Sequence, residues 1–142
     1  MPKVQADGLP LPQRYGAILT IVIGISMAVL DGAIANVALP TIATDLHATP
    51  ASSIWVVNAY QIAIVISLLS FSFLGDMFGY RRIYKCGLVV FLLSSLFCAL
   101  SDSLQMLTLA RVIQGFGGAA LMSVNTALIR LIYPQRFLGR GM

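Results

Sequence analysis

Four long hydrophobic runs dominate this sequence, and each is long enough to cross a lipid bilayer as a helix. They cover residues 17–39, 54–74, 83–100 and 107–128. Crossing about 30 Å of hydrocarbon takes roughly 20 helical residues, and a chain exposed to lipid must satisfy its backbone polar groups internally. The runs therefore predict an all-α transmembrane protein in which four helices span the membrane.

The composition excludes a soluble domain. Of the 142 residues, 58% are hydrophobic and 10% are charged, with a mean hydropathy of +0.90, which leaves too few polar side chains for a water-exposed surface. We expect residues 1–142 to form a single transmembrane region. Cys86 and Cys98 share one run and lie about 18 Å apart along a helix, so they cannot bond to each other and are interpreted as apolar packing residues.

The charged residues outside the runs sort by connection. Lysine and arginine occur before the first run, between the second and third, and after the fourth, whereas residues 40–53 and 101–106 carry only Asp45, His47 and Asp102. Because positive charge is retained on the cytoplasmic side, we expect a multi-pass protein of the cell (inner) membrane with both termini in the cytoplasm. The net charge of +4 is thus a topology signal, and no basic cluster has the interleaved aromatic residues that indicate nucleic-acid binding.

Two charges remain inside the predicted spans, Asp31 in the first and Arg111 in the fourth. Each costs about 2.5–3.5 kcal/mol to insert, and such residues usually face a partner or a water-filled cavity. Helical rise puts Asp31 about 12 Å and Arg111 roughly 6–10 Å from the outer ends of their helices. A direct or water-bridged pair is therefore possible, either as a structural ion pair or as a protonatable site coupled to transport.

Small and polar residues accompany both charges at helical spacing. The first span has a stripe of Gly24, Ala28, Asp31, Ala35 and Ala38, and the fourth carries on one face Arg111, Gln114, Gly115, Gly118 and Asn125. Small residues let helices approach closely in lipid, so both faces are expected to point into the bundle.

The second span adds Asn58 and Gln61 beside Trp55 and Tyr60. With the two charges, these residues predict a polar, aromatic-edged cavity in the outer half of the bundle. Asn58 and Gln114 either line a substrate path or hydrogen-bond across helices.

The connection between the second and third spans reads SFLGDMFGYRRIY over residues 72–84. Gly79 can adopt a positive φ in a tight turn, and Asp76 can cap a turn or bind an arginine. The segment resembles the signature G-x-L-A-D-R-x-G-R-R that the major facilitator superfamily has between its second and third helices, with Asp76, Gly79 and Arg81 in register and Arg82 beside them. Three positions depart from that signature and thin its charge network: Ser72, Met77 and Tyr80.

Two further motifs resemble the same family. RVIQGFGGAALMSVN, residues 111–125, resembles its helix-4 motif R-x-x-Q-G-x-G-A/G-A, with register matches at Arg111, Gln114, Gly115 and Gly117. LDGAIANVALP, residues 30–40, resembles the helix-1 signature L-D-x-T-I-V-N-V-A-L-P of the fourteen-helix drug:proton antiporter branch, with Ala33 in place of the threonine. Three motifs in the family's order span nearly the whole chain, which is identified on this basis as a member.

The resemblance implies roles that composition and spacing do not show. In the family, the helix-4 arginine is associated with proton coupling and the helix-1 acid with cation recognition or protonation, so Arg111 and Asp31 would form the coupling pair. Asp76, Gly79 and Arg81, with Arg82, would form a gating loop. The implied substrates are lipophilic or quaternary ammonium cations, exported against protons, with the proton gradient as energy source and with neither cofactor nor metal.

Family members have twelve or fourteen helices, so the four spans are expected to be the N-terminal portion of a transporter, inactive without its remaining C-terminal helices or other chains. Two alternatives stay open: a small non-transporting four-helix assembly or scaffold protein, and a transporter of the small multidrug resistance type. Members of that type use a glutamate in helix 1 and lack the motifs around Asp76 and Arg111. An enzyme is not expected, because the sequence has no metal-ligand cluster, nucleophile–base pair or phosphate loop.

Overall fold

The computed structural model describes residues 11–132, which form four α-helices and no β-strand. The helices are α1 (Leu11–Asp45), α2 (Pro50–Phe78), α3 (Tyr80–Ala99) and α4 (Leu104–Ile132). All four are long and apolar enough to cross a membrane. The predicted all-α transmembrane fold with four spans is therefore confirmed.

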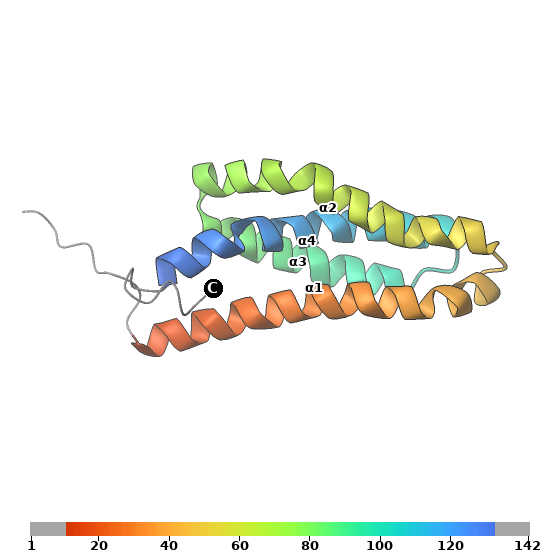
Figure 1. The fold of residues 1–142 in the computed structure, drawn as a ribbon, viewed down its shortest axis with the longest axis horizontal. Helices are drawn as coiled ribbons and strands as arrows, with labels where there is room; N and C mark the ends of the chain where they lie inside the picture. The colour runs from red at the N-terminus through yellow and green to blue at the C-terminus, as the bar shows by residue number, and fades with distance from the viewer. Residues whose placement is uncertain (1–10, 133–142) are drawn as a thin grey trace, which may run out of the picture.

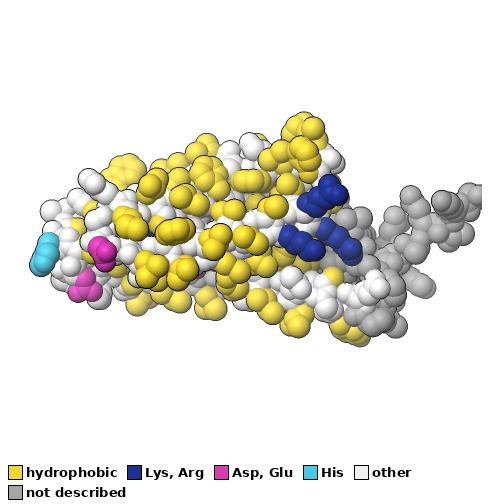
Figure 2. Space-filling view, turned by 180° about the vertical axis from the view of Figure 1, so that it is seen from behind, with side chains coloured by type: hydrophobic (Ala, Val, Ile, Leu, Met, Phe, Trp, Pro, Cys, Tyr) yellow, Lys and Arg dark blue, Asp and Glu magenta, His cyan; other side chains and the backbone are white. Residues whose placement is uncertain are grey.

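The helices run back and forth along one long axis, so their connections alternate between two ends of the bundle (Figure 1). The α1–α2 and α3–α4 connections lie at one end, and the α2–α3 connection lies at the other. Figure 2 shows Lys and Arg side chains gathered at one end and Asp and His side chains at the other, with a broad hydrophobic band between them. The exposed basic residues there are Arg81, Arg82 and Lys85. The charge asymmetry seen along the sequence thus becomes an asymmetry between the two ends of the molecule.

The predicted helix bounds were too short for all four spans. α1 extends from Leu11 through Pro40 to Asp45, and α2, α3 and α4 also begin before their hydrophobic runs. Hydropathy marks only the part of a helix that faces hydrocarbon, whereas the backbone hydrogen bonds of a helix continue into the polar interface.

Local capping explains where α2 begins. The side-chain oxygen of Thr49 accepts a hydrogen bond from the backbone N–H of Ser52 at 3.2 Å, and Pro50 occupies the first helical position, where no backbone donor is needed. These capping signals lie outside the hydrophobic run, so a prediction based on hydropathy places the start of α2 four residues too late.

A single residue, Gly79, separates α2 from α3. Its φ of 93° and ψ of 129° fall in a region that residues with a Cβ rarely adopt. Its backbone N–H donates to the carbonyl of Gly75 at 3.0 Å, which closes the end of α2. The glycine predicted for a tight turn therefore makes the reversal between the two helices.

The most buried helix is α4. In its apolar segment 61% of the residues are buried, whereas 17–22% are buried in the apolar segments of the other three helices. Its glycines allow this central position by packing on two sides. A Cβ added at Gly115 would lie 2.7 Å from the Cβ of Ala63 in α2, whereas one added at Gly117 would lie 2.7 Å from the backbone nitrogen of Phe91 in α3. Gly118 faces the Tyr60 hydroxyl of α2.

The outer helix α1 contacts the bundle along the small-residue stripe predicted from the sequence. Ala28 and Ala35 are 3% and 5% exposed. Gly24 is buried against the hydroxyl of Tyr84 in α3, which donates to the Thr20 carbonyl at 2.9 Å. Small residues therefore bring α1 close enough for polar contacts across the interface.

We predict that Gly117→Ala lowers the free energy of unfolding by about 1–3 kcal/mol, because its Cβ would meet backbone atoms of α3 that cannot move aside independently. Thermal unfolding of the detergent-solubilised protein measures this. The matched control is Gly16→Ala in α1, whose Cβ would have nothing within 4 Å and should be neutral or stabilising by up to about 1 kcal/mol. Equal melting temperatures for the two variants would contradict the tight α3–α4 contact.

Candidate functional site

Asp31 and Arg111 form a direct ion pair between α1 and α4. Arg111 Nη1 donates to Asp31 Oδ2 at 2.6 Å. The Arg111 side chain is 9% exposed and that of Asp31 is 20% exposed. Of the two arrangements that the helical depths permitted, direct contact is the one that the structure has.

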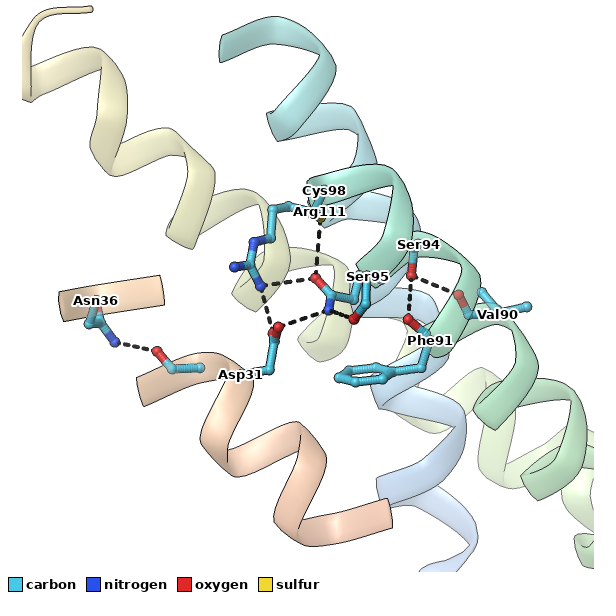
Figure 3. Close-up of polar contacts among 10 residues, drawn as sticks. Asp31, Asn36, Val90, Phe91, Ser94, Ser95, Cys98 and Arg111 are labelled. Carbon is cyan, nitrogen blue, oxygen red and sulfur yellow. Dashed lines mark hydrogen bonds and ion pairs between the residues drawn. The ribbon is translucent and has the colours of Figure 1, made fainter. Parts of the chain in front are cut away.

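Gln114 joins the pair, which Figure 3 shows, from three residues further along α4. Its Nε2 donates to Asp31 Oδ1 at 2.9 Å, and its Oε1 accepts from Arg111 Nη1 at 2.9 Å. The residue is completely buried. Each carboxylate oxygen of Asp31 therefore accepts one N–H from α4.

Two residues of α3 complete the cluster, and the sequence reasoning missed both. Ser95 Oγ accepts from Gln114 Nε2 at 2.7 Å, and the Cys98 thiol lies 3.6 Å from Gln114 Oε1, to which it donates. The interpretation of Cys98 as an apolar packing residue was wrong. Ser95 and Cys98 lie three residues apart and share a helix face, but serine and cysteine are common inside membrane helices and nothing in the sequence distinguishes these two.

Tyr60 of α2 covers the other side of the arginine. The centre of its ring lies 6.0 Å from the Arg111 guanidinium carbon, at the outer limit for a cation–π contact. A cavity of about 30 Å³ adjoins this pair, and its lining includes Gly32, Asn36, Tyr60, Gln61 and Arg111. It has room for one or two water molecules. Within the described residues, Arg111 Nε and the Tyr60 hydroxyl have no hydrogen-bond partner.

The predicted polar cavity is only partly as expected. Gln61 lines it, although its side chain is exposed, whereas Asn58 is exposed and is not among the residues that line it. Trp55 is 59% exposed and lies in a separate groove with Leu104 and Thr108. Asn58 and Trp55 were expected in one cavity with Arg111, but neither of them lines the cavity beside Arg111.

The predicted gating loop has one side-chain contact that the sequence did not indicate. The Tyr80 hydroxyl donates to Asp76 Oδ1, one helical turn away across Gly79. Arg81 and Arg82 are exposed on the first turn of α3, and among the described residues Asp76 makes no ion pair with either. Tyr80 occupies the position where the family signature has a basic residue, and in this chain it takes the role of hydrogen-bond partner to the aspartate.

The remaining predicted site residues are the glycines of the helix contacts. Gly24, Gly115, Gly117 and Gly118 are all buried. They do not share one face, because Gly117 is directed toward α3 while Gly115 and Gly118 are directed toward α2. Asn125 is half-buried, and its Oδ1 has no hydrogen-bond partner in the described part of the chain.

A bundle of apolar membrane helices that buries an ion pair and an amide places the chain in the class of multi-pass membrane proteins with intramembrane ionisable groups, which commonly mark ion and substrate pathways. Comparison with known proteins narrows the class. Residues 21–142 match the sequence profile of the Major Facilitator Superfamily. The chain belongs to this superfamily.

The chain is also similar to individual members. It is 33% identical over 132 residues to the riboflavin transporter RibZ of Clostridioides difficile, covering 93% of this chain and 29% of that protein. It is 35% identical over 127 residues to the tetracenomycin C resistance and export protein of Streptomyces glaucescens, covering 89% and 23%. MdtD of Salmonella paratyphi B, named for multidrug resistance, is 39% identical over 115 residues, covering 81% and 24%. The chain spans about a quarter of the length of these relatives.

Family membership removes one of the two alternatives that the sequence left open. A transporter of the small multidrug resistance type is excluded, because the match to the major facilitator superfamily covers the second half of α1 and all of α2, α3 and α4.

We predict that Asp31 and Arg111 are energetically coupled. Asp31→Asn leaves a buried guanidinium without its counter-ion and should lower the free energy of unfolding by about 3 kcal/mol. The double variant Asp31→Asn with Arg111→Gln should be less destabilised than the sum of the single variants, with a coupling energy of at least about 1 kcal/mol. A double-mutant cycle from denaturant unfolding in detergent measures this, and strict additivity would show that the pair contributes nothing to the fold.

Proposed function

We propose that these helices form the N-terminal part of a proton-coupled exporter of lipophilic or quaternary ammonium cations. The observation that carries the proposal is the double acceptance at Asp31, whose two oxygens take N–H donors from Arg111 and Gln114. These N–H groups cannot accept a hydrogen bond in return. Protonation of either oxygen removes the negative charge and therefore weakens the hydrogen bonds that join α1 to α4.

This arrangement links protonation of Asp31 to the contact between α1 and α4. When Asp31 is ionised, it holds Arg111 and Gln114, and when it is protonated its hold on α4 weakens. A substrate cation near the site favours the ionised acid by charge attraction, and a proton competes with that cation for the same group. Such competition is the basis of antiport.

The relatives support export more firmly than they support one substrate. The Streptomyces protein is named for resistance to and export of tetracenomycin C, MdtD for multidrug resistance, and RibZ for riboflavin transport. The three names agree on no single substrate, so the proposal of a lipophilic cation rests on Asp31 rather than on the relatives.

We also propose that transport requires more helices than the four described here. Alternating access in this fold moves two halves about a site near the midplane, and the relatives are about four times as long as the matched segment. The exposed apolar residues of α1 and α2, among them Val37, Val65 and Leu69, are available for packing against such helices or lipid. Exposed Asn58 and Gln61 would lie beside a central path.

The competing proposal is that Asp31 and Arg111 only fix α1 against α4 in a non-transporting assembly. The direct contact and the burial of Gln114 are compatible with this role. A purely structural pair predicts that neutralising Asp31 lowers efflux only in proportion to the folded protein lost, whereas a coupling site predicts loss of transport in the protein that still reaches the membrane.

We predict that Asp31→Asn abolishes proton-driven efflux of a lipophilic cation such as ethidium. The assay uses cells that express the complete product of the gene encoding this chain, with membrane levels measured by immunoblotting. Asp45→Asn is the matched control, because Asp45 is an exposed acid on the same helix outside the cluster, and it should leave efflux unchanged. Undiminished efflux in Asp31→Asn at normal expression would rule out the coupling role.

We further propose that the end of the bundle bearing Arg81, Arg82 and Lys85 faces the cytoplasm of the cell whose inner membrane holds the protein. A reporter enzyme that is active only outside the cytoplasm should be active when fused after Ala48 and inactive when fused after Arg82. The opposite pattern of activity would reverse the proposed orientation.

A further inference from the structure

The Gln114 amide uses its complete hydrogen-bonding capacity. Its carbonyl accepts from Arg111 and from the Cys98 thiol, and its amino group donates to Asp31 and to Ser95. A primary amide offers two acceptor and two donor positions. Because the side chain is completely buried, no solvent molecule stands ready to replace a partner that is lost.

The amide can satisfy this cluster in one orientation. In the opposite one, its nitrogen would face the Arg111 cation and its oxygen would face the Asp31 carboxylate, and both contacts would be repulsive. Ser95 is the acceptor for the second N–H, at 2.7 Å. This contact connects the Asp31 site to α3, a helix that touches neither member of the ion pair through a hydrogen bond in the described part of the chain.

The neighbouring serine shows that this contact is specific. The Ser94 hydroxyl donates to the carbonyls of Val90 and Phe91 in its own helix, at 2.7 Å and 3.0 Å. Serine in membrane helices commonly bonds to the preceding turn in this way. Figure 3 shows the Ser94 hydroxyl bonded to Val90 and Phe91 of its own helix, whereas the Ser95 hydroxyl accepts from Gln114. Two adjacent residues of the same type thus differ in whether they reach the cluster.

We propose that Ser95 is a positioning residue for the Asp31 site: by accepting one N–H of Gln114, its hydroxyl holds the other N–H on the Asp31 carboxylate. The proposal deepens the proposed function, on which it rests for its link to transport. Loss of the Ser95 hydroxyl frees the amide to turn and weakens the Gln114–Asp31 hydrogen bond. The Asp31 carboxylate then keeps one firmly held N–H donor in place of two, which alters the balance between its charged and protonated forms.

The ionisable groups that face Asp31 come from three helices: Arg111 on α4, Tyr60 on α2 and Cys98 on α3. Within the described residues, none of them hydrogen-bonds to Ser95. A substitution confined to Ser95 therefore acts on Asp31 through Gln114.

The test is an infrared titration of the protein in lipid bilayers. The carbonyl stretch of protonated Asp31, assigned as the band missing in Asp31→Asn, is followed against pH. In Ser95→Ala we expect the midpoint to be displaced by about half a pH unit from that of the parent protein. Ser94→Ala is the matched control and should leave the midpoint in place, and Ser95→Thr, which keeps the hydroxyl, should restore the parent value.

A second measurement connects the effect to transport. The pH profile of ethidium efflux should be displaced in Ser95→Ala and should be unchanged in Ser94→Ala. An equal midpoint and an equal pH profile in Ser95→Ala and Ser94→Ala would overturn the proposal. If Ser95→Ala does not fold, Ser95→Cys replaces it, since its thiol is a weak acceptor of similar size, and the absence of any shift in that variant would overturn the proposal as well.

Failure of this proposal is distinguishable from failure of the proposed function. If Asp31→Asn abolishes efflux while Ser95→Ala behaves as Ser94→Ala, only the role of Ser95 is wrong. If Asp31→Asn leaves efflux intact while the infrared midpoint still moves in Ser95→Ala, Ser95 positions the amide of a structural ion pair and the exporter mechanism is wrong.

Discussion

The rest of the structure depends on a charged contact in an apolar setting, where Asp31 of α1 meets Arg111 and Gln114 of α4. Neither charge is stable alone among hydrocarbon side chains, so each requires the other and the helices that carry them must meet at one height. The amide bridges the two, because it accepts from the cation and donates to the anion. A polar cluster of this kind ties α1 to a bundle that it otherwise touches mainly through small residues.

Close approach of the helices makes that contact possible. The glycines of α4 bring its backbone against α2 at Gly115 and against α3 at Gly117, and Ala28 and Ala35 of α1 are buried in the bundle. Larger residues at these points would separate the helices by more than the reach of Asp31, a short side chain. The polar contacts therefore depend on the close packing of the helices. Because α4 carries both the packing glycines and the polar residues, it is the central helix.

The connection between α2 and α3 shows how a family motif tolerates change. The chain retains the aspartate and the glycine of the motif at Asp76 and Gly79, but it has Tyr80 where a basic residue is usual. The phenol hydroxyl reaches Asp76 from the first turn of α3, so the aspartate keeps a donor although the charge is lost. Gly79 cannot be exchanged as easily, because its positive φ is required for the reversal between α2 and α3.

Much of this architecture could be predicted from local patterns in the sequence. The number and order of the spans, the sorting of charge between the two ends, the inward-facing stripe of α1 and the turn at Gly79 follow from hydropathy, helical periodicity and the conformational freedom of glycine. These properties depend on residues within a few turns of one another. The helix ends were less predictable, since hydropathy reports contact with lipid rather than the extent of a helix.

The sequence by itself determined that two opposite charges would be buried in the same half of one bundle, because span length and helical rise set their depths. Only the tertiary structure decided that they touch, that Gln114 bridges them and that Ser95 and Cys98 join from α3, while Asn58 and Trp55 do not take part. Those outcomes depend on how each helix is rotated about its axis against its neighbours. That rotation results from packing between side chains distant in the chain, and no local pattern specifies it.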